Sequence, residues 1–179
     1  MKTNKNDVIE KAKSLFAKMG YKKVTMIDIA EVAEVSRPTL YALFPDKDAV
    51  FSACIYSHIE DFRIDFKTRA EKTKSSEGKL QALFDIYVIE PFKMYYPSKD
   101  ALDMLNNATT YAPKEMDVYW GDFEKALHQT LTDGHKKRSS QSKDIARVLA
   151  CFARDARSTA KDAKDLTKLV RTAIEMALR

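Results

Sequence analysis

Apolar residues recur along most of this chain at the spacing of a helix, with polar residues between them. Between residues 6 and 19, Val8, Ile9, Ala12 and Phe16 fall on one face. Apolar positions at i, i+3, i+4 and i+7 are typical of an amphipathic α-helix. The pattern predicts an all-α fold of about nine helices. The expected ranges are 6–19, 26–33, 36–44, 46–68, 79–90, 98–108, 113–133, 142–157 and 163–178.

Composition supports this fold class and a cytoplasmic protein. Four Gly and five Pro among 179 residues are too few for a loop-rich β protein. No apolar run reaches the roughly 18 residues of a membrane span, and acidic residues interrupt the first 16 positions, which excludes a signal peptide. Residues 71–78 are the best candidate linker. The two cysteines, Cys54 and Cys151, lie in apolar helical stretches, and we expect buried, reduced thiols.

The most informative stretch is residues 25–47, which predict two short helices joined by a tight turn. Thr25 and Ser36 precede the helices, where their side chains can accept hydrogen bonds from unpaired amides of the first turn. In the second helix Leu40 and Phe44 point inward, four residues apart. Two helices crossing over a turn of about three residues form a helix-turn-helix, whose second helix enters the major groove of DNA.

Residues 7–54 resemble the DNA-binding head of the TetR family of bacterial transcriptional regulators. The resemblance covers about a quarter of the chain and implies a helix-turn-helix DNA-binding domain at residues 1–47 and a helical ligand-binding and dimerisation domain at 48–179. It also implies a homodimer on a palindromic operator. The matching residues are Ala17, Gly20, Tyr21, Thr25, Asp28, Ile29, Ala30, Ala33, Val35, Ser36, Thr39, Leu40, Tyr41, Phe44, Lys47 and Ala49.

The outer side of the second helix supplies the expected base contacts. Arg37 is placed to contact a guanine, while Pro38 and Ala42 can touch a thymine methyl group. Lys22 and Lys23 either contact phosphates or are merely exposed. Of the formal net charge of +5, residues 1–47 hold nine Lys or Arg against six Asp or Glu. The predicted DNA-binding residues, including those holding phosphates, are Thr25, Ser36, Arg37, Pro38, Thr39, Tyr41, Ala42 and Lys47.

Three positions depart from the family pattern. Glu34 stands where the family usually has Gly, in a turn that often takes positive φ. Either a Glu there costs on the order of 1 kcal/mol in strain, or the turn is slightly different in this chain. Ile27 replaces a commonly polar or basic residue that can reach DNA, and Leu43 replaces a His or Tyr. These departures shift the expected binding toward Arg37 and the phosphate-contacting residues.

Aromatic and Met side chains concentrate between residues 58 and 123, where the resemblance places a sensor. A subset is expected to line a cavity for a small, largely apolar or aromatic effector. The effector would favour one tilt of the 46–68 helix and so weaken DNA binding. The ligand-pocket candidates are His58, Phe62, Phe66, Phe84, Tyr87, Met94, Tyr95, Met104, Tyr111, Tyr119, Trp120 and Phe123.

The last two predicted helices each carry one apolar face. They could simply close the core, but in the family such helices pair with those of a second subunit as a four-helix interface. The dimer-interface candidates are Ile145, Val148, Leu149, Phe152, Ala156, Leu166, Leu169, Val170, Ala173 and Ile174.

Other functions find less support in the sequence. An enzyme is disfavoured because His58, His128 and His135 are scattered, and no HExxH, GxSxG, phosphate loop or CxxC is present. His58 and Asp61 are three residues apart, which is weak evidence for a metal site. We expect no metal and no cofactor. The alternative is a helix-turn-helix regulator or scaffold without a small-molecule ligand, controlled by a protein partner.

Overall fold

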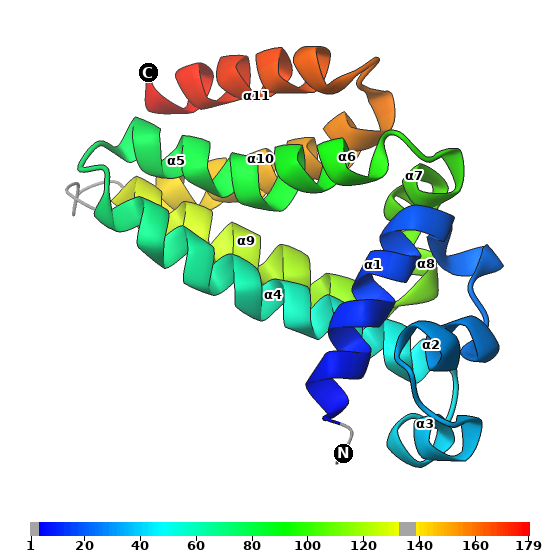
Figure 1. Ribbon diagram of the computed structural model, residues 1–179. Coiled ribbons are helices and arrows are strands. Elements are labelled where there is room, and N and C mark those ends of the chain that lie inside the picture. Colours follow the sequence, from blue (N-terminus) through cyan, green and yellow to red (C-terminus); the bar gives the residue numbers. More distant parts are fainter. Residues whose placement is uncertain (1–3, 133–138) are drawn as a thin grey trace. The chain divides into compact units, whose positions relative to one another are not determined.

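A computed structural model describes residues 4–132 and 139–179 of the chain. Every regular element within those ranges is a helix, so the predicted all-α fold is confirmed (Figure 1). The elements are α1 (Lys5–Lys23), α2 (Met26–Val32), α3 (Arg37–Leu43), α4 (Lys47–Glu71), α5 (Ser76–Phe84), the π-helix η1 (Asp85–Ile89), α6 (Glu90–Tyr95), α7 (Lys99–Asn106), α8 (Ala108–Tyr111), α9 (Pro113–Thr132), α10 (Ser139–Thr159) and α11 (Ala163–Leu178).

The largest difference from the predicted helices lies around Pro91. We expected Pro91 to kink or end a helix, because proline lacks the amide that pairs with the carbonyl four residues earlier. The chain instead passes through η1 into α6, with the Glu90 amide donating to the Asp85 carbonyl, five residues back. The carbonyl of Tyr87, four residues before Pro91, accepts a hydrogen bond from the Tyr119 hydroxyl. A side chain thus replaces the donor that proline lacks.

Contacts divide the chain into two compact units. The first contains Met1–Glu60 and Met94–Met116, and the second contains Asp61–Lys93 and Asp117–Arg179. The first unit therefore includes α7 and α8 besides the helix-turn-helix. Our sequence-based boundary after residue 47 stays a prediction.

The first unit is built on a close approach between α1 and α7. Gly20 interrupts α1 with φ of 73°, the left-handed conformation that glycine adopts without strain. A Cβ added to Gly20 would lie 2.3 Å from the Asp100 carbonyl oxygen. The Ser98 hydroxyl donates to the Lys18 carbonyl at 3.1 Å across the same contact. Gly20 is thus required by both its backbone conformation and its neighbour.

The core of the second unit is formed by the inward faces of α5, η1, α9, α10 and α11. α11 packs against α5 and η1 as well as α10 (Figure 1). Helical spacing places Leu166, Val170 and Ile174 on this inner side of α11, where all three are buried. The fully buried side chains that they join include Leu80, Leu83, Phe84, Ile86, Phe123 and Leu127.

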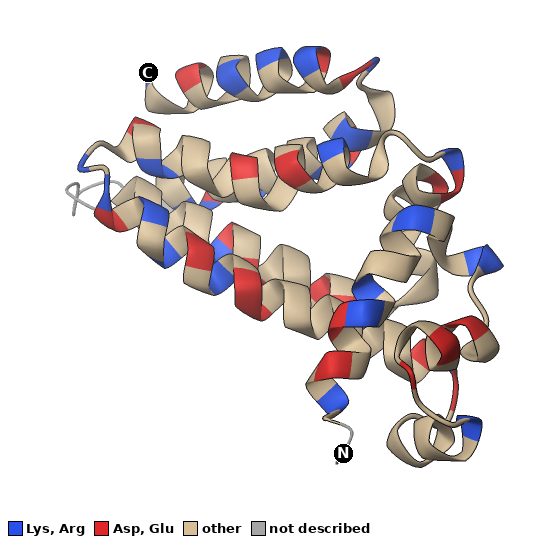
Figure 2. Ribbon diagram, viewed as in Figure 1, with Lys and Arg blue, Asp and Glu red and all other residues tan. Residues whose placement is uncertain are grey.

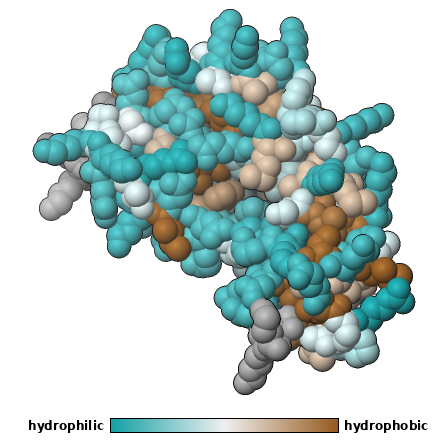
Figure 3. Space-filling model, viewed as in Figure 1, coloured by the Kyte–Doolittle hydropathy of each residue, from teal (hydrophilic) through white to brown (hydrophobic). Residues whose placement is uncertain are grey.

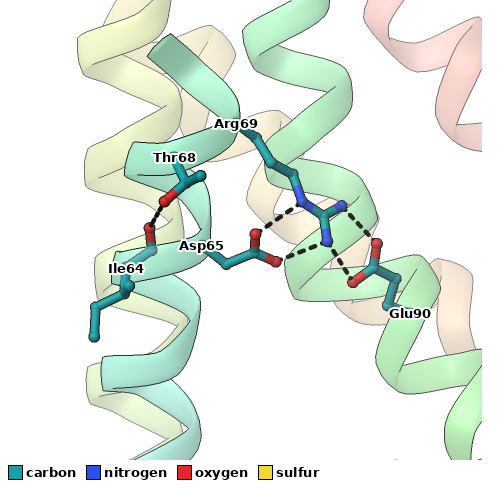
Figure 4. A network of polar contacts seen from close by, with 5 residues as sticks. All are labelled: Ile64, Asp65, Thr68, Arg69 and Glu90. Atoms are coloured by element: carbon teal, nitrogen blue, oxygen red, sulfur yellow. Dashed lines mark hydrogen bonds and ion pairs between the residues drawn. The ribbon is translucent and has the colours of Figure 1, made fainter. Parts of the chain in front are cut away.

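An arginine on α4 joins two carboxylates of the second unit, as Figure 4 shows. Arg69 donates to Asp65, one turn earlier on α4, at 3.0 and 2.7 Å. It also donates to Glu90, the first residue of α6, at 2.6 and 3.1 Å. The hydrogen bond with Glu90 is the main factor raising the pKa of Arg69. Arg69 therefore ties the end of η1 and the start of α6 to α4.

Candidate functional site

The helix-turn-helix begins with a reciprocal cap on α2. The Thr25 hydroxyl accepts from the Asp28 amide at 3.3 Å, and the Asp28 carboxylate accepts from the Thr25 amide at 2.8 Å. This arrangement satisfies two amides that the helix leaves unpaired. The pKa of Asp28 is lowered chiefly by a hydrogen bond that the Thr25 hydroxyl donates to its carboxylate at 2.7 Å, and next by the bond from the Thr25 amide. The predicted Thr25 cap is confirmed.

Of the two alternatives for the turn between α2 and α3, the structure shows the one with Glu34 at positive φ. Glu34 has φ of 57°, the only positive value of a non-glycine residue among those described. The Val35 amide donates to the Ala30 carbonyl at 3.0 Å and closes the turn. The exposed Glu34 carboxylate pairs with Lys11 of α1 at 2.9 Å. The chain thus forms the family's turn with a Glu, at a strain on the order of 1 kcal/mol.

α3 presents two distinct sides. Ser36 caps it by accepting from the Thr39 amide at 3.2 Å. Leu40 and Phe44 are buried at 0% and 2% exposure, as their spacing predicted. Tyr41 is 52% exposed. Arg37, Pro38 and Ala42 are also exposed, whereas Thr39 is half-buried with its hydroxyl 2.7 Å from that of Ser36. The arginine and the tyrosine therefore face outward rather than into the core.

Lys47 is engaged more closely than the sequence suggested. Its Nζ donates to the Tyr21 carbonyl at 2.9 Å and lies 4.2 Å from the centre of the Tyr21 ring. The Tyr21 hydroxyl donates to Asp48, and burial together with that carboxylate raises the pKa of Tyr21 well above its usual value. Tyr21 also stacks on Tyr111 at 4.5 Å. A phosphate contact by Lys47 stays a prediction, and it would compete with these interactions.

The two lysines at the end of α1 pair with carboxylates of α7. Lys22 contacts Asp103 at 3.1 Å, and Lys23 contacts Asp100 at 2.5 Å. The hydrogen bond that Lys22 donates to the Asp103 carboxylate is the first cause of the raised pKa of Lys22. Exposed ion pairs of this kind contribute little to stability. Either lysine can therefore exchange its carboxylate for a DNA phosphate at small cost.

The twelve ligand-pocket candidates are divided between the two units. Met94 is exposed, Met104 and Tyr95 are buried, and Tyr111 and His58 are half-buried in the first unit. The other seven belong to the second unit, where Phe66 is half-buried. The remaining six form one aromatic cluster: Phe62, Phe84, Tyr87, Tyr119, Trp120 and Phe123, with neighbouring ring centres 5.0–6.0 Å apart.

Two arginines beside this cluster were missed by sequence reasoning. Arg154 and Arg157 of α10 lie with their guanidinium carbons 5.4 and 4.6 Å from the centre of the Trp120 ring. Arg157 is buried. Their spacing of three residues places them on one side of α10, and this spacing could have indicated from the sequence that they share a neighbour. Cation–π contacts of this type favour a fixed orientation of Trp120.

The outer faces of α10 and α11 form an apolar groove of about 490 Å³. Six predicted dimer residues line it: Ile145, Val148, Leu149, Phe152, Leu169 and Ala173. Val148 and Met176 are 66% and 70% exposed. The other four candidates, Ala156, Leu166, Val170 and Ile174, are buried within the chain's own core.

The cysteines differ from each other. Cys54 is buried, its thiol donates to the Ile9 carbonyl at 3.6 Å, and burial raises its pKa to about 12. Cys151 is exposed, so the prediction of burial was wrong there. The inward side of α10 is taken by Ala146, Ala150 and Ala153, and Cys151 lies just beside that stripe.

The described residues were also compared with the requirements of a metal site and of a membrane-spanning helix. Among them, no three His, Cys, Asp or Glu side chains gather as metal ligands. His58 is half-buried, and His135 lies outside the described residues. None of the described helices combines the length and the apolar character that crossing a membrane requires.

Comparisons with known proteins agree with this geometry. Residues 8–54 match the family model of bacterial regulatory proteins of the tetR family. The HTH-type transcriptional repressor ComR of Escherichia coli (strain K12) is 25% identical over 185 residues, spanning 95% of this chain and 85% of that protein.

Solved structures share the fold across the whole chain. A TetR transcription regulator from Haloarcula marismortui aligns with a TM-score of 0.76 at 18% identity, covering 97% of this chain and 95% of that one. The fatty acid degradation regulator FadR from Bacillus halodurans aligns with a TM-score of 0.72 at 19% identity, covering 97% and 94%. At such identities the likeness establishes the fold alone.

Proposed function

Because this chain is a TetR-family transcriptional regulator with a helix-turn-helix DNA-binding domain, we propose that it is a repressor that binds a palindromic operator as a homodimer. We further propose that a small, largely apolar or aromatic ligand releases it. The observation that carries the proposal is the two-sided α3, with Leu40 and Phe44 in the core and Arg37 and Tyr41 outside. A protein with this role works in the cytoplasm, where the chromosome is.

Arg37 makes the main base contact in this proposal. It is the only charged residue of α3, it is exposed, and it has no ionic partner among the residues described. Figure 2 shows α3 as mostly tan, with a charged segment only at one end. A guanidinium can donate two hydrogen bonds to a guanine, and such a contact is worth about 1–3 kcal/mol. Thr25, Ser36, Thr39, Tyr41 and Lys47 would hold phosphates and set the register.

The groove between α10 and α11 supports the dimer. It exposes large apolar side chains, chiefly Val148 and Met176, along two neighbouring helices. Pairing this face with its copy about a two-fold axis would cover both at once. Two recognition helices would then meet half-sites about one turn of DNA, or a multiple, apart.

The aromatic cluster supports ligand control. Tyr87 lies within η1, and π-helical turns are frequent at functional sites. A ligand that displaced the Tyr119 hydroxyl from the Tyr87 carbonyl would disturb η1 directly. The tight packing of the same rings favours the alternative, a regulator controlled by a protein partner.

Selection from random duplex DNA with the purified protein tests the proposal. We expect enrichment of an inverted repeat, bound by two chains. Failure to enrich any sequence would refute the operator proposal. The effector is sought by adding apolar and aromatic compounds to the bound complex, and a complete screen without release would favour the partner-controlled alternative.

A further inference from the structure

The helix-turn-helix exposes large apolar side chains on both of its helices. Ile27 of α2 is 49% exposed and Tyr41 of α3 is 52% exposed, while Pro38 and Ala42 are exposed beside Tyr41. Single exposed hydrophobic residues are ordinary on protein surfaces. Four of them on two short neighbouring helices of one helix-turn-helix are a different case. Figure 3 shows hydrophobic surface gathered over the part of the molecule that contains this head.

Ile27 does not belong to the buried core of the head. The inner face of α2 is provided by Ile29 and Ala30, which are 0% and 4% exposed. The cap of α2 is formed by Thr25 and Asp28 on either side of Ile27 in the chain. Helical spacing puts the exposed Glu31, four residues on, on the same outer side as Ile27. The isoleucine is therefore available to a partner.

Most of the charge in the head is already engaged within the first unit. On α3 itself, Arg37 is the only charged residue, and its exposed neighbours Pro38, Tyr41 and Ala42 carry largely apolar side chains. The paired lysines include Lys11 with Glu34, Lys13 with Glu10, Lys22 with Asp103, Lys23 with Asp100, and Lys47 with the Tyr21 carbonyl.

Base edges in the major groove offer only one apolar group, the 5-methyl of thymine. We propose that Ile27 reads a thymine methyl in each operator half-site, so that α2 as well as α3 determines the sequence bound. This inference rests on the proposed function, because it concerns the same DNA-binding surface. The inference adds a base contact from α2 to those from α3. It also predicts thymine at the contacted position, where a polar side chain would prefer another base.

Deoxyuridine provides the test, because it pairs as thymine does and lacks only the methyl group. Each thymine of the selected operator is replaced singly by deoxyuridine, and the Kd is measured by fluorescence anisotropy. For the unaltered protein we expect about fourfold weaker binding per half-site at the thymine that Ile27 contacts, and about fifteenfold when both half-sites are changed. The unaltered protein alone can refute the idea, whatever the variants do.

Two alanine variants identify the side chain responsible. Ile27→Ala should lose the preference for thymine over deoxyuridine at that position and keep it at any thymine read by α3. Ile64→Ala is the matched control, because Ile64 is 67% exposed on α4 in the second unit and should leave every ratio unchanged. Circular dichroism verifies that both variants are folded.

The outcomes separate this inference from the function on which it rests. If no sequence is enriched, both fail. If an inverted repeat is recovered but deoxyuridine is tolerated at every thymine, or the half-sites contain no thymine, only the role of Ile27 is refuted. The role of Ile27 is also refuted if replacing thymine by deoxyuridine weakens the binding of Ile27→Ala and of the unaltered protein by the same factor.

Discussion

Replacing Gly20 by alanine tests the packing that holds the first unit together. The residue has φ of 73°, and a Cβ would lie 2.3 Å from the Asp100 carbonyl oxygen and 2.6 Å from its carbon. The left-handed conformation costs an L-residue about 1–2 kcal/mol. The overlap is with backbone atoms, which cannot rotate away, and forcing such a contact costs about another 1–3 kcal/mol. Gly20→Ala should therefore lower the free energy of unfolding by about 2–5 kcal/mol.

A second glycine supplies the control for this prediction. Gly121 lies inside α9, and a Cβ there would meet no atom within 4 Å. Because glycine weakens a helix interior, Gly121→Ala should stabilise the protein by about 0.5–1 kcal/mol. Urea unfolding followed by far-ultraviolet circular dichroism, at one fixed protein concentration, measures both changes. Equal stability of Gly20→Ala and the unaltered protein would refute the packing of α1 on α7.

Three further predictions concern charge, assembly and thiol chemistry. Asp100→Asn with Asp103→Asn should free the two lysines at the end of α1, and the slope of log K against log salt should steepen by about 0.9 for each phosphate gained. Val148→Glu should place a charge in the proposed dimer face and convert dimers to monomers in sedimentation velocity. Cys151 should react with a thiol reagent in the native protein, whereas Cys54 should react only on unfolding. Because the pKa of Cys54 rises from 9.0 to about 12 on folding, its thiol contributes stability that is present below pH 9 and lost as pH rises toward 12.

Each of these has a distinct control or contradiction. An unchanged salt slope would mean that the lysines do not reach phosphates. Ile64→Glu, an equally exposed isoleucine outside the groove, should leave the assembly intact. Equal labelling of the two thiols in the native protein would contradict the burial of Cys54.

Local chemistry made much of the head predictable. Thr25 and Ser36 correctly indicated where α2 and α3 begin, and the four-residue spacing of Leu40 and Phe44 predicted the inner face of α3. For Glu34 the sequence left two alternatives, a strained positive φ or a slightly different turn, and the structure shows the positive φ. Such signals work because they depend only on residues a few positions apart.

Interactions between distant residues were not predictable in the same way. Nothing near Lys47 in the sequence indicates that it faces Tyr21, or that the two lysines after Gly20 meet carboxylates of α7. The course of the chain through Pro91 depends on a hydroxyl from α9, 28 residues later. These contacts arise from tertiary packing, which a periodic pattern does not specify.

The account depends most directly on the outer side of α3. Binding of the selected operator should be measured by fluorescence anisotropy for Arg37→Ala beside Arg179→Ala, which removes the same charge at the end of the chain. Loss of one guanine contact of about 1–3 kcal/mol in each half-site should weaken binding by at least about thirtyfold in Arg37→Ala, with Arg179→Ala unchanged. Operator affinity that is the same in both variants would contradict the assignment of α3 as the recognition helix.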